Sequence, residues 1–362
     1  MGKYDKDRFQ KELALRYCIA RGMVPFLEVV VRSASDLSDT SEVLTDLDVV
    51  GLEVIGDGSL RRTLFDCKSS GRMSSVNRAF WAAGVKAYTG CDDAHVILKS
   101  RAVNNHRYTA LTMSVDLHDE DSFTALGKTI DAAFPADECY QSSIDRWNSL
   151  YDGYANQKWT DATFDLVRNQ VPLTKTPWRT FRKILAELRR VRGDFDPSKP
   201  IHFAIYFEVL AACFVLWSSM GRDLRRFFDP GMKKDEFEKV FRYYLWGGKE
   251  SFEMRQQLRA RSVEGKKADT ALELPAWPKL LAFAGLIMDA PQRIFDCAFV
   301  CREIALRACA DRNGGFDQKL HKRLNGNPRI RQFSSSLNEY IIDAGGLPRD
   351  LAKIADAVLF KA

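Results

Sequence analysis

The stretch Asp46-Leu-Asp-Val-Val-Gly-Leu-Glu-Val-Ile55, the turn Gly56-Asp-Gly-Ser59 and the stretch Leu60-Arg-Arg-Thr-Leu-Phe-Asp-Cys-Lys68 decide the fold of this chain. The two outer segments are rich in β-branched and aromatic residues, which favours strands. Glycines on both sides of an aspartate indicate a hairpin turn between them. We therefore predict two antiparallel strands joined by a tight turn.

Helix and strand signals surround this hairpin in a definite order. Apolar residues at helical spacing predict helices over residues 6–21 and 74–88, and apolar β-branched runs predict strands over 24–32 and 94–99. A further strand is expected within 108–117, with a short helix around 103–108 intervening before it. The prediction is an α/β domain over residues 1–125, with a mixed sheet flanked by helices.

From about residue 123 onward nearly every long segment has a helical pattern, punctuated by prolines. We therefore expect an all-α domain over residues 126–362, with the boundary between 120 and 150. The helices are predicted over residues 123–134, 178–191, 202–228, 234–246, 252–262, 279–289, 292–311 and 347–361.

The third predicted strand carries an unusual set of polar residues. Strand alternation places Asp66 and Lys68 on one face, and the same phase on the paired strand brings Asp48 beside Asp66. Two carboxylates suit a hard divalent cation such as Mg²⁺, which polarises a phosphate and activates water. An ammonium beside them offsets charge in the transition state. The competing interpretation is a surface ion pair on an exposed edge strand.

Two further acids compete for a place in this set. Asp46 lies on the same face one pleat away from Asp48, whereas Glu53 is out of phase with it. The geometry of the strand therefore favours Asp48 over Glu53.

An acid on one strand, a Gly-Asp-Gly turn and acid-x-Lys on the next strand resemble the PD-(D/E)xK nuclease superfamily. The resemblance covers roughly residues 5–120 and rests on Thr45-Asp-Leu-Asp48-Val-Val-Gly and Leu64-Phe-Asp66-Cys-Lys68-Ser. The family core runs helix, three strands, helix, strand, so the resemblance implies a restriction-endonuclease-like fold. Leu47 stands where the family name has proline, and the Gln-x-x-x-Tyr motif of one branch is absent.

The resemblance also implies roles for individual residues. Asp48 and Asp66 match the metal ligands, with Mg²⁺ or Mn²⁺ as the cofactor, and Lys68 matches the catalytic lysine. The main-chain carbonyl of Cys67 is expected to complete the metal shell. Glu12 on the first helix is the candidate for an additional acid, and a solvated helix residue is its alternative interpretation. Lys86 on the second helix is a candidate phosphate contact.

Charge is distributed unevenly along the chain. Residues 1–130 hold 17 Lys and Arg against 18 Asp and Glu, whereas the remainder holds 37 against 30. Basic residues with interleaved aromatics suit a nucleic-acid surface, and a solvated helix face above an aromatic core is the alternative. The candidate contacts are Arg179, Arg182, Arg189 and Arg190, with further clusters at Arg222, Arg225 and Arg226 and over residues 255–267.

These features predict a divalent-metal-dependent endonuclease, with DNA as the expected substrate, serving defence, restriction or recombination. The alternative is a nuclease-fold module that binds nucleic acid or assembles with a partner and is inactive alone. The helical domain is expected to bind nucleic acid, a second copy or a partner protein. Eight cysteines without metal-binding spacing favour a reducing cytoplasm. The apolar run 201–217 is predicted to be a buried core helix and not a membrane span.

Overall fold

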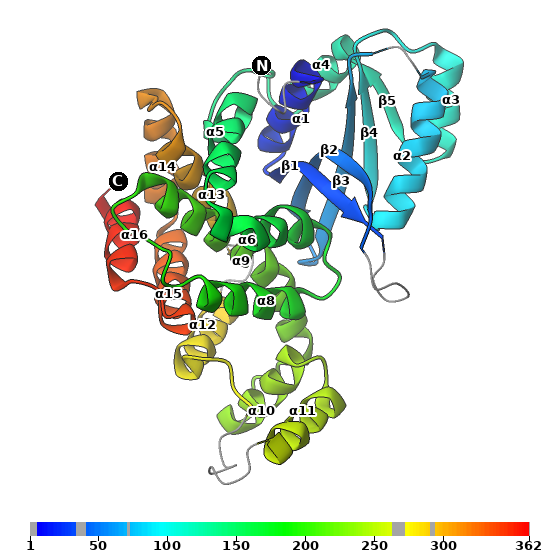
Figure 1. Ribbon diagram of the computed structural model, residues 1–362. Helices are drawn as coiled ribbons and strands as arrows, with labels where there is room; N and C mark the ends of the chain where they lie inside the picture. Colours follow the sequence, from blue (N-terminus) through cyan, green and yellow to red (C-terminus); the bar gives the residue numbers. More distant parts are fainter. Residues whose placement is uncertain (1–5, 34–40, 71–72, 263–271, 290–293, 362) are drawn as a thin grey trace.

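The computed structural model describes residues 6–33, 41–70, 73–262, 272–289 and 294–361. Its N-terminal part is a five-stranded sheet with helices on both faces, and the remainder is helical (Figure 1). The prediction of an α/β part followed by an all-α part is confirmed at this level. Residues 34–40, together with Lys266 and Lys267 of the basic cluster, lie outside the described residues.

The sheet is mixed, and its strands lie in sequence order, β1-β2-β3-β4-β5. The pairs β1–β2 and β2–β3 are antiparallel, and the pairs β3–β4 and β4–β5 are parallel. The elements are α1 (Arg8–Ala20), β1 (Val24–Arg32), β2 (Val43–Val54), β3 (Leu60–Lys68), α2 (Ser75–Thr89), β4 (Asp93–Leu98), α3 (Asn104–Thr112), β5 (Asp116–Asp119) and α4 (Glu120–Lys128).

The segment between β4 and α4 differs from the prediction of a strand over 108–117. Helix α3 occupies the first half of that range and includes the short helix expected around 103–108, and β5 is a short strand of four residues beyond α3. Asn104 and Asn105 begin a helix whose apolar residues are few, so its pattern is weak in the sequence.

The β2–β3 turn fixes the register of the central hairpin. The Ile55 amide donates to the Ser59 carbonyl at 3.0 Å, and the Asp57 carboxylate accepts from the Ser59 amide at 2.8 Å. Gly58 has φ +80°, a conformation that favours glycine. The hairpin predicted from Gly56-Asp-Gly-Ser59 is therefore confirmed.

The two faces of the sheet are covered by different helices. Tyr17 of α1 and Phe123 of α4 pack against Phe65 of β3, so α1 and α4 lie on one face. Arg78 of α2 contacts Asp66, the next residue of β3, whose side chain projects from the other face. Figure 1 shows α2 with α3 beside it on that side.

Helix α1 approaches β2 closely at a glycine. A Cβ atom on Gly51 would lie 2.8 Å from the Cys18 Sγ atom and 2.8 Å from the Met23 Sδ atom. Glycine at this position lets the helix rest directly on the strand.

The helical part is built around α9, a helix of 28 residues along which α13 packs. Short 3-10 turns cover Tyr140–Ser142 and Lys158–Thr160, and a π-helical turn covers Leu166–Gln170. The helices are α5 (Ile144–Ala155), α6 (Asp161–Asp165), α7 (Val171–Leu173), α8 (Pro177–Arg190), α9 (Pro200–Phe227), α10 (Lys234–Leu245), α11 (Lys249–Ser262), α12 (Trp277–Asp289), α13 (Ile294–Cys309), α14 (Gly314–Gly326), α15 (Pro328–Gly345) and α16 (Arg349–Lys361).

Helix α9 has the length and apolar composition of a membrane span, the one such helix among the described residues. Within its most apolar window, 89% of the residues are buried inside the protein. The prediction that this run forms a buried core helix is therefore confirmed.

Hydrogen bonds and packing join the sheet to the helical part. Arg302 of α13 is fully buried, and its guanidinium contacts Glu208 of α9 at 2.7 Å and donates to the Pro25 carbonyl of β1. The Tyr151 hydroxyl donates to the Leu27 carbonyl at 2.9 Å. One cluster of buried hydrophobic residues runs through both parts.

None of the eight cysteines, all of which the structure describes, forms a disulfide, and seven of them are buried. Cys297 and Cys301 lie one turn apart on α13 with fully buried side chains, as small residues on a helix face.

Candidate active site

Three acidic residues form a row across β1, β2 and β3. Val49 is paired with Phe65, and continuing this register by one residue places Asp48 opposite Asp66. The register of β1 with β2 places Glu28 opposite Asp48 in the same way. The predicted neighbourhood of Asp48 and Asp66 thus follows from the strand pairing, and Glu28 extends it.

Three cations pair with these acids. Lys11 of α1 binds Glu28 and is 3.6 Å from Asp48. The Lys68 ammonium donates to the Asp48 carboxylate at 2.8 Å and is 3.5 Å from Asp66. Arg78 contacts both oxygens of Asp66, with its Nε atom at 2.8 Å. We call these six residues the charged row, ordered Glu28, Lys11, Asp48, Lys68, Asp66 and Arg78.

The ladder between β2 and β3 opens at this row. The amide of Cys67 donates to the Asp48 carboxylate at 2.8 Å, where a paired strand would otherwise supply a carbonyl. The amide and carbonyl of one strand residue point to the same side. The Cys67 carbonyl therefore faces the same opening, which is the orientation that the expected metal ligand requires.

A fourth acid, Asp7, lies beside the row just before α1. Its carboxylate accepts from the Ser69 amide at 2.7 Å and is 3.8 Å from the Lys68 ammonium. Lys68 is thus surrounded by the carboxylates of Asp7, Asp48 and Asp66. Four acids against three cations leave these seven residues with a net charge of −1.

Burial sets the protonation of the row. Asp66 is 1% exposed, and burial raises its pKa, while Arg78 and Lys68 oppose that rise. Burial would lower the pKa of Lys68, but Asp48 and Asp66 raise it above the ordinary lysine value. Lys68 is therefore a cation at neutral pH, which suits charge stabilisation and the orientation of water more than proton abstraction.

The other end of the row follows the same physics. Burial would lower the pKa of Lys11, but Asp48 and Glu28 raise it. Burial raises the pKa of Glu28, and Lys11 counteracts this. Glu28 also has φ +56°, a strained conformation for a residue with a side chain, at a typical cost of about 1–3 kcal/mol. Strain of this kind is commonly found at functional sites.

The structure corrects the placement expected for Glu12. Its carboxylate accepts from the Ile144 amide at 3.3 Å and pairs with Arg8 and Arg16 at 3.3 Å. It therefore faces the start of α5 and not the Asp48–Asp66 pair. Its neighbour Lys11 takes the position facing the row, because successive residues of a helix differ by about 100° in direction.

The two rival acids lie apart from the row. Asp46 is exposed and stands opposite Val30 of β1. Glu53 pairs with Arg21 of α1 at 3.1 Å, on the other face of the sheet. The strand phase that favoured Asp48 over Glu53 is confirmed.

The basic residues predicted to contact nucleic acid have varied surroundings. Lys86 donates to the Ser114 carbonyl at 2.9 Å, and Arg190 binds Glu187. Arg182 lies over the rings of Trp178 and Trp246, and burial lowers its pKa to about 10. The two remaining candidates, Arg179 and Arg189, are exposed.

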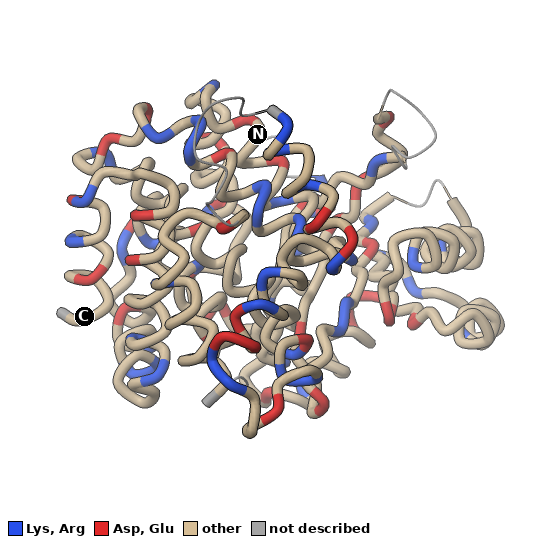
Figure 2. The backbone as a smooth tube through the Cα atoms, turned by 90° about the horizontal axis from the view of Figure 1, so that it is seen from below, with Lys and Arg blue, Asp and Glu red and all other residues tan. Residues whose placement is uncertain are grey.

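Of these five basic residues, Arg179 lines a polar cleft between β1, the end of α2 and α8. Lys175 and Lys183 lie in the same cleft. Figure 2 shows basic and acidic positions interspersed along the helices of the protein. The predicted basic residues therefore do not form one surface, and Arg182 packs against tryptophan rings.

The donor set of the row fits a hard divalent cation. Mg²⁺ is commonly held by one or two carboxylates, with water and substrate phosphate completing its shell. Asp48, Asp66 and the Cys67 carbonyl would supply the oxygens. Both Asp66 oxygens contact Arg78, so metal binding requires Arg78 to move away from them. Among the described residues no three His, Cys, Asp or Glu side chains already form a metal-binding group.

The opposite face of the sheet holds a pair of histidines. His95 stacks on Phe65 and on His118, with ring centroids 5.2 Å and 5.8 Å apart. Its Nδ1 atom is 3.7 Å from the Asp116 carboxylate. Burial lowers the pKa of His95 to about 4, so its ring is neutral at physiological pH.

Sequence reasoning did not find Asp7, Lys11, Glu28 or Arg78. Lys11 and Glu28 carry a usable signal, since charged residues at apolar positions of a helix or strand require a partner.

No model of a known protein family matches the chain, and the searches of curated proteins and solved structures found no significant match. The charged row and its place in the sheet therefore carry the functional proposal.

Proposed function

We propose that this chain is a divalent-metal-dependent endonuclease that hydrolyses phosphodiester bonds, with DNA as its substrate. The observation that carries the proposal is the alignment of Asp48 opposite Asp66, with Lys68 between them. Helix, three antiparallel strands, helix and parallel strand follow one another in the order of the PD-(D/E)xK core, which supports a restriction-endonuclease-like fold.

Five residues of the row have a defined task in this proposal. Asp48 and Asp66, with the Cys67 carbonyl, would hold the cation, which would supply polarisation of the phosphate and activation of water. Lys68 keeps its proton and stabilises the negative charge that develops on the phosphate oxygens. Lys11 holds Asp48 in place by contacting its second oxygen, Oδ1.

Arg78 has two positions in this scheme. Without metal it neutralises Asp66, and its guanidinium stacks over Trp81 at 4.6 Å. To free the Asp66 oxygens for a metal, Arg78 would have to leave that carboxylate. Its guanidinium would then be available to bind the substrate phosphate in the bidentate manner typical of arginine.

The proposal is tested by incubating the full chain with plasmid, linear duplex, single-stranded and branched DNA, and with RNA, in Mg²⁺, Mn²⁺ or EDTA. We expect cleavage with either metal and none in EDTA. Asp66→Asn and Lys68→Met should abolish it, whereas Lys86→Met should not. Equal cleavage by the chain and both site variants would overturn the assignment.

A second candidate function follows from the neutralisation of Asp66 by Arg78 and Lys68. In this alternative the row is a structural ion-pair network, and the chain binds nucleic acid or a partner without cleaving. Binding would then be indifferent to Mg²⁺ and would survive Lys68→Met. A partner protein or second copy contacting the helical part would be required for any activity.

A further inference from the structure

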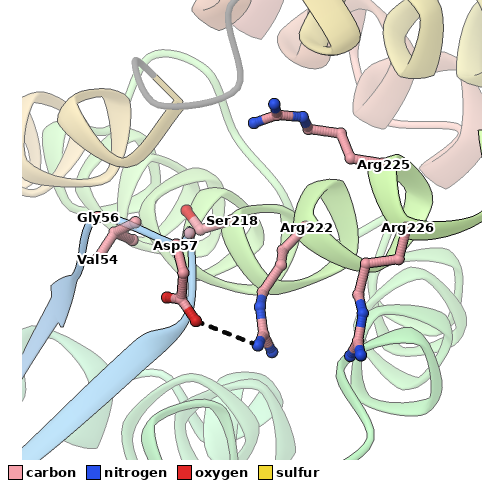
Figure 3. Close-up of a pocket in the computed structure, with 8 residues that line it drawn as sticks. Val54, Gly56, Asp57, Ser218, Arg222, Arg225 and Arg226 are labelled. Atoms are coloured by element: carbon pink, nitrogen blue, oxygen red, sulfur yellow. Dashed lines mark ion pairs between the residues drawn. The ribbon is translucent and has the colours of Figure 1, made fainter.

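A pocket of about 480 Å³ lies between the β2–β3 turn and the C-terminal part of α9 (Figure 3). The turn contributes Asp57 and two glycines, which leave much of that wall without side chains. Helix α9 contributes Arg222, Arg225 and Arg226. The wall of the pocket is thus largely backbone on the side of the hairpin and strongly basic on the side of the helix.

The positive charge in this pocket is only partly compensated. Arg222 pairs with Asp57 at 3.5 Å, and Figure 3 shows Arg226 lying alongside it. Within the described part of the chain, Arg225 and Arg226 form no ion pair with an acidic side chain. Other arginines of this protein do, as Arg61 with Asp93 at 2.6 Å illustrates.

A favourable interaction with the helix dipole does not by itself explain why three arginines line this pocket. Arg225 and Arg226 lie in the last turn, where cations interact favourably with the helix dipole. Arg222 lies one turn earlier and extends toward the hairpin (Figure 3). The guanidiniums of Arg222 and Arg226 repel each other in this pocket, so an anion between them would be bound favourably.

We propose that this pocket binds a backbone phosphate of the nucleic acid on which the charged row acts; the inference rests in part on the proposed function. Guanidinium groups bind phosphate oxygens in a bidentate manner, and phosphate contacts position a nucleic acid without selecting its sequence. Asp48 and Asp66 lie on the two strands of the β2–β3 hairpin, and the turn of the same hairpin lines the pocket, so the hairpin would set the distance between the two sites.

The hairpin gives that distance. Asp48 precedes Val54, which lines the pocket, by six residues, or about 20 Å of strand at roughly 3.3 Å per residue. Successive phosphates of one strand of duplex DNA advance by about 3.4 Å along the axis. The two sites would therefore contact the backbone about six base pairs apart. A small phosphorylated molecule would gain nothing from this spacing, which is why the backbone is the favoured occupant.

The test is the salt dependence of binding to a fluorescent 30-base-pair DNA duplex, measured by anisotropy in EDTA so that no cleavage occurs. Each phosphate contact that is lost lowers the slope of log affinity against log salt by about one. We expect Arg225→Ser with Arg226→Ser to weaken binding and to lower the slope by about one, because the pocket holds one phosphate. Arg349→Ser with Lys353→Ser on α16 removes the same charge far from the hairpin and should leave the slope unchanged.

A second variant acts in the opposite direction. Asp57→Asn keeps the oxygen that accepts from the Ser59 amide but removes the negative charge from the pocket. We expect it to bind the duplex more tightly than the unmodified chain. Unchanged affinity in both Asp57→Asn and the double arginine variant would overturn the proposal.

Competition and cleavage separate the remaining outcomes. If ATP or inorganic phosphate loses affinity in the double arginine variant while the duplex slope is unchanged, the assignment to a nucleic-acid backbone is wrong. Asp66→Asn should keep the slope of the unmodified chain. A chain that shows the arginine effect but never cleaves refutes the nuclease and supports the pocket, and a chain that cleaves without the arginine effect does the reverse.

Discussion

Replacing Lys11 by methionine should destabilise the fold strongly. The Lys11 side chain is 4% exposed, binds Glu28 and lies 3.6 Å from Asp48, so its loss leaves two buried carboxylates without that cation. At an effective dielectric constant near 20, the contact with Asp48 alone is worth about 4–5 kcal/mol. Desolvation of the ammonium offsets part of this gain, and removing one member of a buried pair typically costs 3–5 kcal/mol. We therefore expect Lys11→Met to lower the free energy of unfolding by about 4 kcal/mol.

The measurement is urea unfolding followed by circular dichroism. Lys353→Met is the matched control, because Lys353 is 78% exposed and its pair with Asp350 should contribute less than about 1 kcal/mol. Adding Glu28→Gln to Lys11→Met should recover part of the loss by removing one uncompensated charge. A loss below 1 kcal/mol in Lys11→Met, equal to that of the control, would refute the arrangement of the row.

Three further changes test other parts of the structure. The neutral His95 ring has a folded pKa of about 4, below the ordinary 6.5, so the free energy of unfolding falls by about 3 kcal/mol as pH falls from 6.5 to 4. His95→Phe should remove this pH dependence, which urea unfolding at pH 7 and pH 4 measures. An unchanged pH dependence would contradict the burial of the ring. Gly51→Ala should cost about 1–3 kcal/mol, because the new Cβ atom would meet Cys18 at 2.8 Å; a neutral effect in urea unfolding would show that α1 can move. Arg302→Leu should cost about 3–5 kcal/mol by leaving Glu208 buried without its partner, and a loss under 1 kcal/mol would contradict the buried pair.

The central hairpin was predictable because its signals are local. Glycines flanking Asp57 determine the turn, and β-branched residues determine the two strands. Strand alternation then determines which acids share a face. It therefore predicted that Asp48 and Asp66 lie on one face and excluded Glu53 from that face. The structure adds the register, which places Asp48 directly opposite Asp66.

The cations of the row were not predictable from strand phase. Lys11 and Arg78 come from two helices on opposite faces of the sheet, and their approach to the acids depends on how each helix docks. Glu12 was the candidate that the family resemblance implied on this helix, but a rotation of about 100° separates it from Lys11, which faces the row. The apolar pattern of α1 is irregular, so the sequence does not determine whether residue 11 or residue 12 faces the sheet.

Several helices gave weak signals for a different reason. The sequence of α5 contains Asp152 and Gly153, and α14 begins with two glycines, so both lack strong helical propensity. Helix α15 contains three consecutive serines, which favour caps and turns when taken in isolation. Tertiary packing of their buried faces stabilises these helices, and propensity alone underestimates them.

The proposed role of Asp48 as a metal ligand is best tested by comparing metal-dependent cleavage by Asp48→Asn with that by Asp46→Asn. Both residues lie on the same face of β2, but only Asp48 binds Lys68 and the Cys67 amide. Under single turnover with Mg²⁺ on duplex DNA, the account predicts that Asp48→Asn lowers the cleavage rate at least about 100-fold, as loss of a group central to transition-state stabilisation does. Asp46→Asn should cleave at the rate of the unmodified chain. Equal rates for the two variants, or cleavage that persists in EDTA, would contradict the account.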